Sequence, residues 1–198
     1  MKIKHVAFGF FWITIVACGG AGSGVGAKDY SSLGFVQWKK ANGGNDHWYK
    51  AVSQTTSISW RDAERLAEGL EGHLVTIQSD EENTFVSGLV SDSKFWVNWS
   101  GAEFGPWLGG RAPDNRVNPT DGWNWVTSEV WTFTKWVPGE PSNGGSAKNE
   151  NGLQYARQAS ASAPFSWNDV ASSGAAENAG GGVISYIMEI DGIRPVTP

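Results

Sequence analysis

The chain has 198 residues, 40% of them hydrophobic and 13% aromatic, so it can bury a core, and disorder throughout is excluded. Its twelve Trp and 26 Gly exclude a helical bundle or a coiled coil and favour a loop-rich, aromatic-packed module, because Gly destabilises helices and Trp fills large gaps. The net charge of -5 becomes -7 without the first 17 residues (13 basic against 20 acidic), so phosphate backbones are repelled and nucleic acid is not expected as a partner.

The first 17 residues have the pattern of a secretory signal peptide. Lys2 and Lys4 precede an apolar run from Val6 to Ala17, which is shorter than the roughly 20 residues that span a bilayer. The run leads into Cys18 in a way that resembles the bacterial lipobox, in which this Cys is diacylated and becomes the mature N-terminus. An ordinary signal peptide with an unpaired Cys near its end is the alternative. We therefore expect an exported protein, lipid-anchored through Cys18 to the bacterial cell envelope. Residue 19, directly after this Cys, is Gly and not Asp, and in a bacterium with two membranes this favours anchoring in the outer membrane.

The next segment, residues 18–34, is rich in Gly and Ser and predicts a flexible tether. We expect one C-terminal domain over residues 35–192, followed by a short tail at 193–198, because neither an internal repeat nor a second linker is evident. The lone Cys cannot form an intrachain disulfide.

The front half of this domain has one strand signal and one strong helix signal. Residues 47–52 (HWYKAV) predict a strand. The S-x-x-D sequence from Ser59 to Asp62 is a capping box, and a helix is expected from about 60 to 70. Its apolar stripe at i, i+3, i+4 and i+7 is predicted to consist of Ala63, Leu66, Ala67 and Leu70.

A second helix follows an extended piece at residues 73–77. A second capping box runs from Ser79 to Glu82. The apolar side of this helix is predicted to consist of Phe85, Val86, Leu89 and Val90. Helical periodicity then stops, and seven Trp lie between Trp96 and Trp136 among Gly, Pro, Asn and Asp, which indicates short strands and long loops. Two helices followed by a strand-and-loop half predict an α+β fold.

This order of segments resembles the C-type lectin-like domain over roughly residues 44–191. The segments that carry the resemblance are HWYKAV, SWRDAERLAEGLEGHLVTIQSDEENTFV, WLGG, DGWNWV, TKWVPGEPSN, SWNDV and ISYIMEI. WLGG and GWNWV look most like the bacterial members. The resemblance implies two helices packed on short antiparallel strands with a long irregular loop region. Animal members usually have two disulfides, and this chain has other residues at the corresponding places: Ala67 and Met188 for one pair, Gly152 and Ser172 for the other.

Two separated stretches near the C-terminus supply oxygen ligands that suit Ca²⁺, which takes six to eight oxygens. They contain three carboxylates and several neutral oxygens, at Glu140, Ser142, Asn143, Glu150, Asn151, Asn168 and Asp169. Clustered carboxylates repel one another unless a cation compensates them. The resemblance implies that these side chains bind Ca²⁺ and that two neighbouring sugar hydroxyls complete the coordination, with Trp167 anchoring the second stretch. The predicted metal ligands are Glu140, Ser142, Asn143, Glu150, Asn168 and Asp169, and all but Asn143 are also predicted to bind the sugar.

The first stretch departs from the family pattern. The family tripeptides are Glu-Pro-Asn for mannose-type sugars and Gln-Pro-Asp for galactose-type sugars, whereas this chain has Glu140-Pro141-Ser142. Either Ser142 or Asn143 completes the site. The Glu-first order favours equatorial vicinal hydroxyls, as in mannose, glucose, fucose or GlcNAc. In the family the Glu-Pro bond is cis, and we expect the same here.

Three further interpretations concern nearby residues. Asp114, Asn118 and Asp121 could form a second calcium site, although their sequence is typical of a surface loop. Trp123 and Trp131 are candidates for stacking on a sugar, with core packing favoured for both. Paired carboxylates such as Glu140 and Glu150 could serve a glycosidase.

An enzyme is nevertheless not expected. HExxH and GxSxG are absent, and His47 and His73, the only histidines after the signal peptide, are interpreted as structural. The sequence therefore predicts a surface-tethered adhesion protein that binds carbohydrate through Ca²⁺. The alternative is a lectin-like scaffold that binds a protein or another surface ligand without recognising sugar, and ice binding is a further alternative.

Overall fold

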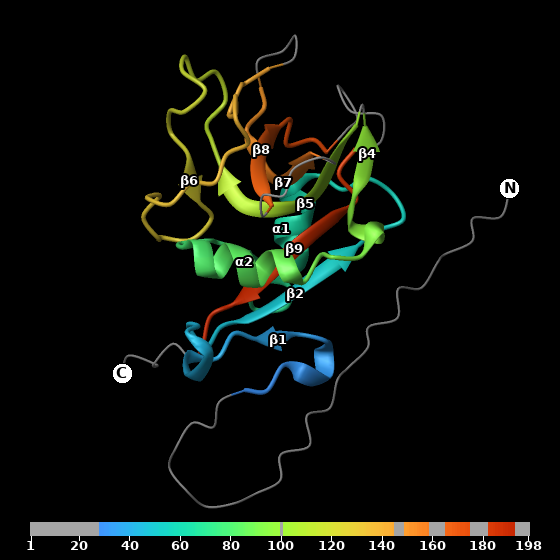
Figure 1. Ribbon diagram of the computed structural model, residues 1–198, viewed down its shortest axis with the longest axis vertical. Coiled ribbons are helices and arrows are strands. Elements are labelled where there is room, and N and C mark those ends of the chain that lie inside the picture. Colours follow the sequence, from blue (N-terminus) through green and yellow to red (C-terminus); the bar gives the residue numbers. More distant parts are fainter. Residues whose placement is uncertain (1–27, 100, 145–148, 159–164, 175–181, 193–198) are drawn as a thin grey trace, which may run out of the picture.

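The computed structural model describes residues 28–192 except for 100, 145–148, 159–164 and 175–181 (Figure 1). Cys18, the signal peptide and the tail at 193–198 lie outside the described residues. Among the helices of the described part, none has the length and apolar character needed to cross a membrane. Lys28 to Gly34, which were expected in the tether, include a 3-10 turn at Ser31–Leu33, and Tyr30 packs there against Phe35 and Trp48.

The strands form one sheet of mostly antiparallel pairs in the order β1-β2-β9-β5-β7-β8, with β3 beside β9 and both β4 and β6 beside β5. β9 pairs antiparallel with β2 and β3 and parallel with β5, so it lies at the centre of the molecule. The strands are β1 (Val36–Gln37), β2 (Trp48–Ser53), β3 (His73–Leu74), β4 (Val97–Trp99), β5 (Ala102–Arg111), β6 (Asn124–Trp125), β7 (Gly152–Gln158), β8 (Ser166–Val170) and β9 (Ser185–Ile190). The α+β, C-type lectin-like architecture predicted from the sequence is confirmed.

Helix α1 (Trp60–Glu68) begins at the predicted capping box, because the Ser59 side chain accepts a hydrogen bond from the Asp62 backbone N–H. Its predicted apolar stripe is half wrong. Leu66 and Leu70 are exposed, whereas Trp60 and Glu64 are buried. Glu64 points inward because its carboxylate accepts the backbone N–H of Leu74, the last residue of β3, at 2.7 Å.

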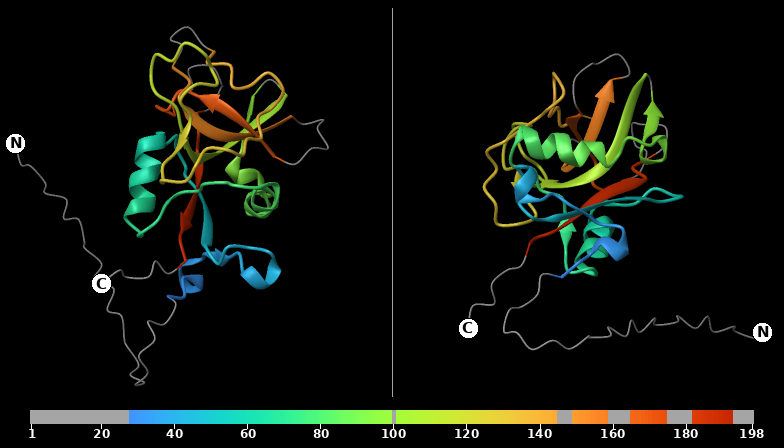
Figure 2. Two further views of the ribbon diagram at one scale, coloured as in Figure 1. Left: turned by 90° about the vertical axis from the view of Figure 1, so that its left-hand side faces the viewer. Right: turned by 60° about the horizontal axis from the view of Figure 1, so that its bottom comes forward.

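The second helix, α2 (Asp80–Gly88), begins at the second predicted capping box, where Ser79 accepts from the Glu82 backbone N–H. Val86 and Val90 are fully buried, and Phe85 and Leu89 pack against the same core, as predicted. The helices cover opposite sides of the β2 and β9 strands (Figure 2). Alternate residues of β9 therefore face different cores: Ile187 packs with the α2 side and Met188 with the α1 side.

Tryptophans fill much of the interior, as expected from the composition. Trp107 and Trp167 have no exposed surface, and Trp167 lies in β8, the strand that it was predicted to anchor. Gly152 and Ser172 stand where animal members have a disulfide, and a Cβ added to Gly152 would lie 3.4 Å from the Ser172 Cα and 2.9 Å from the Trp107 ring. The Trp107 indole thus packs beside the position where animal members have this disulfide.

Candidate functional site

Three segments of chain bring the predicted ligands together at the β7–β8 end of the sheet. Strands β7 and β8 pair with Leu153 opposite Asp169 and Gln154 opposite Asn168. Glu150 lies two residues before β7, and the loop around Glu140 hydrogen-bonds to Asp169 in β8 and to Glu150. We call Glu140, Ser142, Glu150, Asn168 and Asp169 the loop site. The structure thus brings these five residues together.

Asp169 is the buried centre of the loop site and is 1% exposed. Its Oδ1 accepts the Ser142 backbone N–H at 2.9 Å, and its Oδ2 accepts that of Asn143 at 2.9 Å. One carboxylate therefore fixes the two residues that follow Pro141. Asn168 lies beside it and donates from its Nδ2 to the Asp169 backbone oxygen at 2.7 Å.

Glu150 holds the other side of the loop. Its Oε2 accepts the Gly144 backbone N–H and, at 3.3 Å, the Ser142 hydroxyl. The Asn143 side-chain oxygen accepts the Glu150 backbone N–H at 3.2 Å, and Asn143 has a positive φ of 46°. Asn143 thus braces the loop, while the Ser142 hydroxyl lies beside a site carboxylate.

Glu140 differs from its neighbours because its Oε2 is buried and has no hydrogen-bond partner among the described residues. The Glu140-Pro141 peptide bond is cis, as predicted. Burial, together with the nearby charges of Asp169 and Glu150, raises the pKa of Glu140 well above its usual range. Burial and the charge of Asp169 also raise the pKa of Glu150. Both carboxyl groups therefore hold a proton to a higher pH than an exposed glutamate does.

Sequence reasoning missed a buried arginine that belongs to this site. The Arg116 Nη2 lies 2.8 Å from Asp169 Oδ2 and donates to the Glu150 backbone oxygen at 2.6 Å. Its guanidinium packs over the Trp123 ring at 5.2 Å, and its side chain is only 2% exposed. Arg116 comes from a loop rich in Pro, Asn and Asp, which carries no positional signal that an Arg turns inward.

A pocket of about 180 Å³ opens beside these side chains. Its polar wall includes the loop site and Gln154, whose buried Oε1 has no hydrogen-bond partner in the described part of the chain. Val97, Trp99 and Phe104 line it with apolar surface, and Trp99 is 44% exposed. The volume is below the roughly 300 Å³ typical of drug-sized ligand pockets, so it suits an ion and part of a small polar ligand.

The other sequence candidates lie elsewhere. Trp123 is 4% exposed and Trp131 packs on it with ring centroids 5.7 Å apart, so core packing is confirmed for these indoles. Trp99, which sequence reasoning did not single out, is the aromatic residue at the rim of the pocket. The three residues of the possible second calcium site form separate hydrogen bonds. The Asn118 side-chain amide donates to the Asp121 carboxylate at 2.8 Å, and the Asp114 carboxylate accepts from the Asn151 side-chain amide.

Comparison with known proteins agrees with this architecture. Residues 56–176, well over half of the chain, match the lectin C-type domain. The chain is 28% identical to perlucin of Haliotis laevigata over 137 residues, covering 69% of this chain and 73% of perlucin. It is 27% identical to lectin BRA-3 of Megabalanus rosa over 112 residues, covering 56% of this chain and 57% of that lectin.

A solved structure shows the same fold. The carbohydrate-recognition domain of the mouse scavenger receptor C-type lectin superimposes with a TM-score of 0.54 at 17% identity, covering 79% of this chain and 95% of that one. C-type lectin domains are non-enzymatic binding modules, commonly for carbohydrate and typically with Ca²⁺. On the match over residues 56–176, the chain belongs to the C-type lectin domain family.

Proposed function

We propose that this protein binds carbohydrate through a Ca²⁺ ion held in the loop site. The observation that carries the proposal is the buried Glu140 Oε2, which has no partner among the described residues although it lies beside two further carboxylates. A buried acceptor without a hydrogen bond is costly, and a bound cation removes that cost. The atoms that could coordinate a metal here are all oxygens, so a hard cation such as Ca²⁺ is the ion that fits.

Charge supports the same ion. Glu140, Glu150 and Asp169 carry three negative charges when ionised, and Arg116 carries one positive charge within hydrogen-bond distance of Asp169. The remaining two negative charges match one divalent cation. We infer that Glu140, Glu150, Asn168 and Asp169 supply ligands together with the Ser142 hydroxyl. Asn143 is then the brace of the loop, because its side-chain oxygen already accepts the Glu150 N–H.

The sugar is proposed to bind at the mouth of the same pocket. A bound Ca²⁺ supplies coordination for two neighbouring hydroxyls, and the carboxylates and amides beside it accept and donate hydrogen bonds to those hydroxyls. Trp99 offers an exposed aromatic face along the pocket wall. The Glu-first order in the loop favours a sugar with equatorial vicinal hydroxyls.

We further propose that the domain is exported and held at a bacterial cell envelope by a lipid on Cys18, where adhesion would be its role. The support is the sequence pattern that ends in Cys18. Mass spectrometry of the membrane fraction tests this: diacylglyceryl on Cys18 is expected, and a mature N-terminus at another residue would contradict it. A Cys18→Ser variant should leave the membrane fraction.

Calorimetric titration with Ca²⁺, followed by glycan-array binding with and without EDTA, tests the binding proposal. We expect one strong Ca²⁺ site, sugar binding that EDTA abolishes, and loss of both in Glu140→Gln. Glu103→Gln is a matched control, because Glu103 is paired with Arg157 outside the pocket lining. Glycan binding that persists in EDTA would overturn the proposal.

One observation favours a second candidate, a lectin-like scaffold that binds a protein or another surface ligand without sugar. Asp169 already accepts three internal donors, from Ser142, Asn143 and Arg116. The loop thus has an internal framework that does not depend on an ion. Partner binding that survives both EDTA and Glu140→Gln, in the absence of any glycan binding, would favour this candidate.

A further inference from the structure

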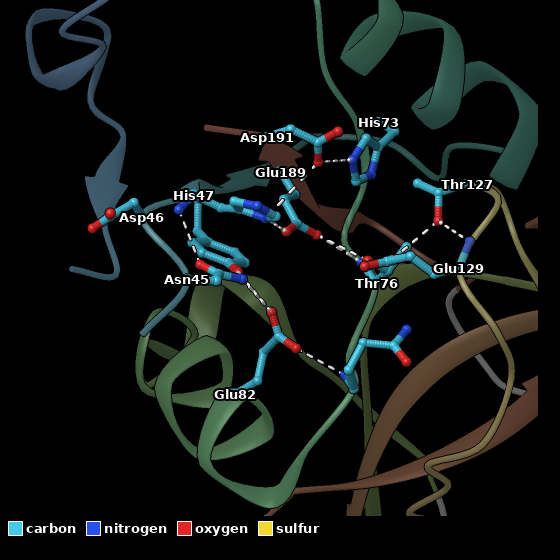
Figure 3. Close-up of polar contacts among 12 residues, drawn as sticks. Asn45, Asp46, His47, His73, Thr76, Glu82, Thr127, Glu129, Glu189 and Asp191 are labelled. Atoms are coloured by element: carbon cyan, nitrogen blue, oxygen red, sulfur yellow. Dashed lines mark hydrogen bonds and ion pairs between the residues drawn. The ribbon is translucent and has the colours of Figure 1, made fainter. Parts of the chain in front are cut away.

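A second group of polar side chains lies at the C-terminal end of β9 (Figure 3). We call His47, His73, Glu189 and Asp191 the histidine cluster. The strand register explains how it forms. Both Tyr49 in β2 and His73 in β3 lie directly opposite Glu189 in β9. Because side chains alternate between faces, His47, two residues before Tyr49, and Asp191, two residues after Glu189, return to the same face.

The donor atoms of the histidine cluster converge. His47 Nδ1 lies 2.6 Å from Glu189 Oε1 and 3.8 Å from Asp191 Oδ1. One donor atom from each of these three residues lies within 4.8 Å of the other two. His73 joins from the other side, with its Nε2 at 3.1 Å from the same Asp191 Oδ1.

Neighbouring groups orient these side chains. The Glu189 Oε2 accepts the backbone N–H and the hydroxyl of Thr76, at 3.0 and 3.2 Å, which directs Oε1 toward His47. His73 Nδ1 lies 2.8 Å from the Leu74 carbonyl oxygen. A carbonyl only accepts, so Nδ1 carries the proton and Nε2 faces Asp191. Metal-binding imidazoles typically have such a carbonyl partner on their other nitrogen.

We propose that the histidine cluster is a Zn²⁺ site, with ligands from His47, Glu189 and Asp191, whose donor atoms lie within 4.8 Å of one another. His73 is not part of that close group, and its Nε2, which lies beside Asp191, would move toward the ion to become the fourth ligand. Imidazole nitrogen together with carboxylate oxygen suits Zn²⁺, whereas Ca²⁺ prefers oxygen alone. Two neutral imidazoles and two carboxylates have a charge that balances a dication. Tetrahedral ligands about 2.0–2.1 Å from Zn²⁺ lie roughly 3.3 Å apart, a value between the 2.6 and 3.8 Å found here.

Burial is compatible with both entry and retention of the ion. Glu189 is 1% exposed and forms the floor, while the side chains of His47 and Asp191 are 23% and 28% exposed. The ion can therefore reach the site from the surface and be held above a buried carboxylate. The ion would crosslink the ends of β2, β3 and β9 in a chain whose single Cys cannot form an intrachain disulfide.

Calorimetric titration of the full chain with ZnCl2 tests the proposal, with the d–d absorption of Co²⁺ as a spectroscopic check on imidazole and carboxylate coordination. We expect one Zn²⁺ per chain at micromolar affinity or tighter, a melting temperature that rises with zinc, and binding that excess Ca²⁺ leaves in place. Asp191→Asn and His47→Gln should each weaken binding at least tenfold. Both positions are partly exposed, so these variants remain testable where a change at Glu189 prevents folding.

Asp46→Asn is the matched control, because Asp46 is the neighbour of His47 and its carboxylate faces Lys40 rather than the histidine cluster (Figure 3). It should bind Zn²⁺ as the wild type does. Equal binding by Asp191→Asn and Asp46→Asn would overturn the proposal. So would zinc binding that is lost in Asp169→Asn, since the ion would then occupy the loop site, or binding only at millimolar zinc.

Discussion

The two ends of strand β9 carry polar clusters of different construction. Gly182 and Val183, just before the strand, line the pocket of the loop site, and Glu189 and Asp191 belong to the histidine cluster at its other end. The loop site has oxygen donors on irregular chain, held by backbone N–H groups. The histidine cluster combines nitrogen and oxygen donors whose positions follow from strand pairing.

This difference shows how donor type and scaffold go together. A loop whose N–H groups bind carboxylates can surround a hard cation with many oxygens, which Ca²⁺ tolerates in variable geometry. Paired strands bring fewer side chains to one point than a loop does, but strand pairing fixes the direction of each side chain. Such an arrangement suits a cation with four ligands. The buried cation Arg116 lies beside the loop site, whereas the basic groups of the histidine cluster are imidazoles, which bind a metal in their neutral form.

The largest expected effect is on the framework of the loop site. Asp169→Ala removes the acceptor of the Ser142 and Asn143 N–H groups and leaves the buried Arg116 without its carboxylate. We expect the free energy of unfolding to fall by about 3–5 kcal/mol, as for other buried pairs broken on one side. Urea denaturation in EDTA measures it.

Glu140→Gln is the contrasting variant, because the buried Glu140 Oε2 has no partner within the described structure. In EDTA, this variant should be as stable as the wild type or more stable, although it loses Ca²⁺ binding. If it costs as much stability as Asp169→Ala, Glu140 belongs to the framework rather than to the ligand set.

Much of the fold and part of the loop site follow from local sequence signals. The two capping boxes set the starts of both helices, and the Trp136-to-Asn143 and Trp167-to-Asp169 segments identify residues of the loop site, because these depend on residues close in sequence. Arg116 and the inward position of Glu64 were missed, because each is decided by a partner far along the chain. The histidine cluster depends on the register of three separated strands, so its histidines were interpreted as structural only.

Near the histidine cluster, a buried acid should make stability depend on pH. Burial and the charge of Glu189 raise the pKa of Glu82 from its ordinary 4.5 to about 7, although Tyr49 hydrogen-bonds it. The folded chain then holds this proton more tightly than the unfolded chain does. The free energy of unfolding should therefore fall as pH rises from about 4.5 to 7, by on the order of 3 kcal/mol from this group.

Glu82→Gln isolates this contribution from those of other titrating groups. Denaturation of the wild type and the variant at several pH values, both in EDTA, gives a difference that should grow in favour of the variant between pH 4.5 and 8. A constant offset reflects only the altered hydrogen bonds to Tyr49 and Asn45. Parallel curves would show that the pKa of Glu82 is the same in the folded and unfolded chains.

A moderate effect on Ca²⁺ affinity is expected when the buried Arg116 beside the loop site is replaced. Arg116→Gln raises the negative charge around the proposed Ca²⁺ position, and Coulomb energies of about 1–3 kcal/mol at roughly 5 Å predict Ca²⁺ binding that is roughly 5- to 150-fold tighter. Stability in EDTA should fall, because Asp169 and the Glu150 carbonyl lose their donor. Calorimetry measures the affinity, and Arg65→Gln, at an exposed position on α1, is the control. Weaker Ca²⁺ binding would mean that the guanidinium orders the ligands more than it repels the ion.

The smallest expected effect separates the sugar from the ion. Trp99 is 44% exposed, lines the pocket and supplies no metal ligand, so Trp99→Ala should leave the Ca²⁺ affinity and the melting temperature nearly unchanged. The loss of one aromatic contact, worth about 0.5–1.5 kcal/mol, predicts roughly two- to twelvefold weaker glycan binding. Trp99→Phe should lie between, and Val130→Ala, at another exposed apolar position, should match the wild type. Unchanged glycan affinity in Trp99→Ala would place the sugar over the carboxylate wall alone and leave the apolar wall without a part in recognition.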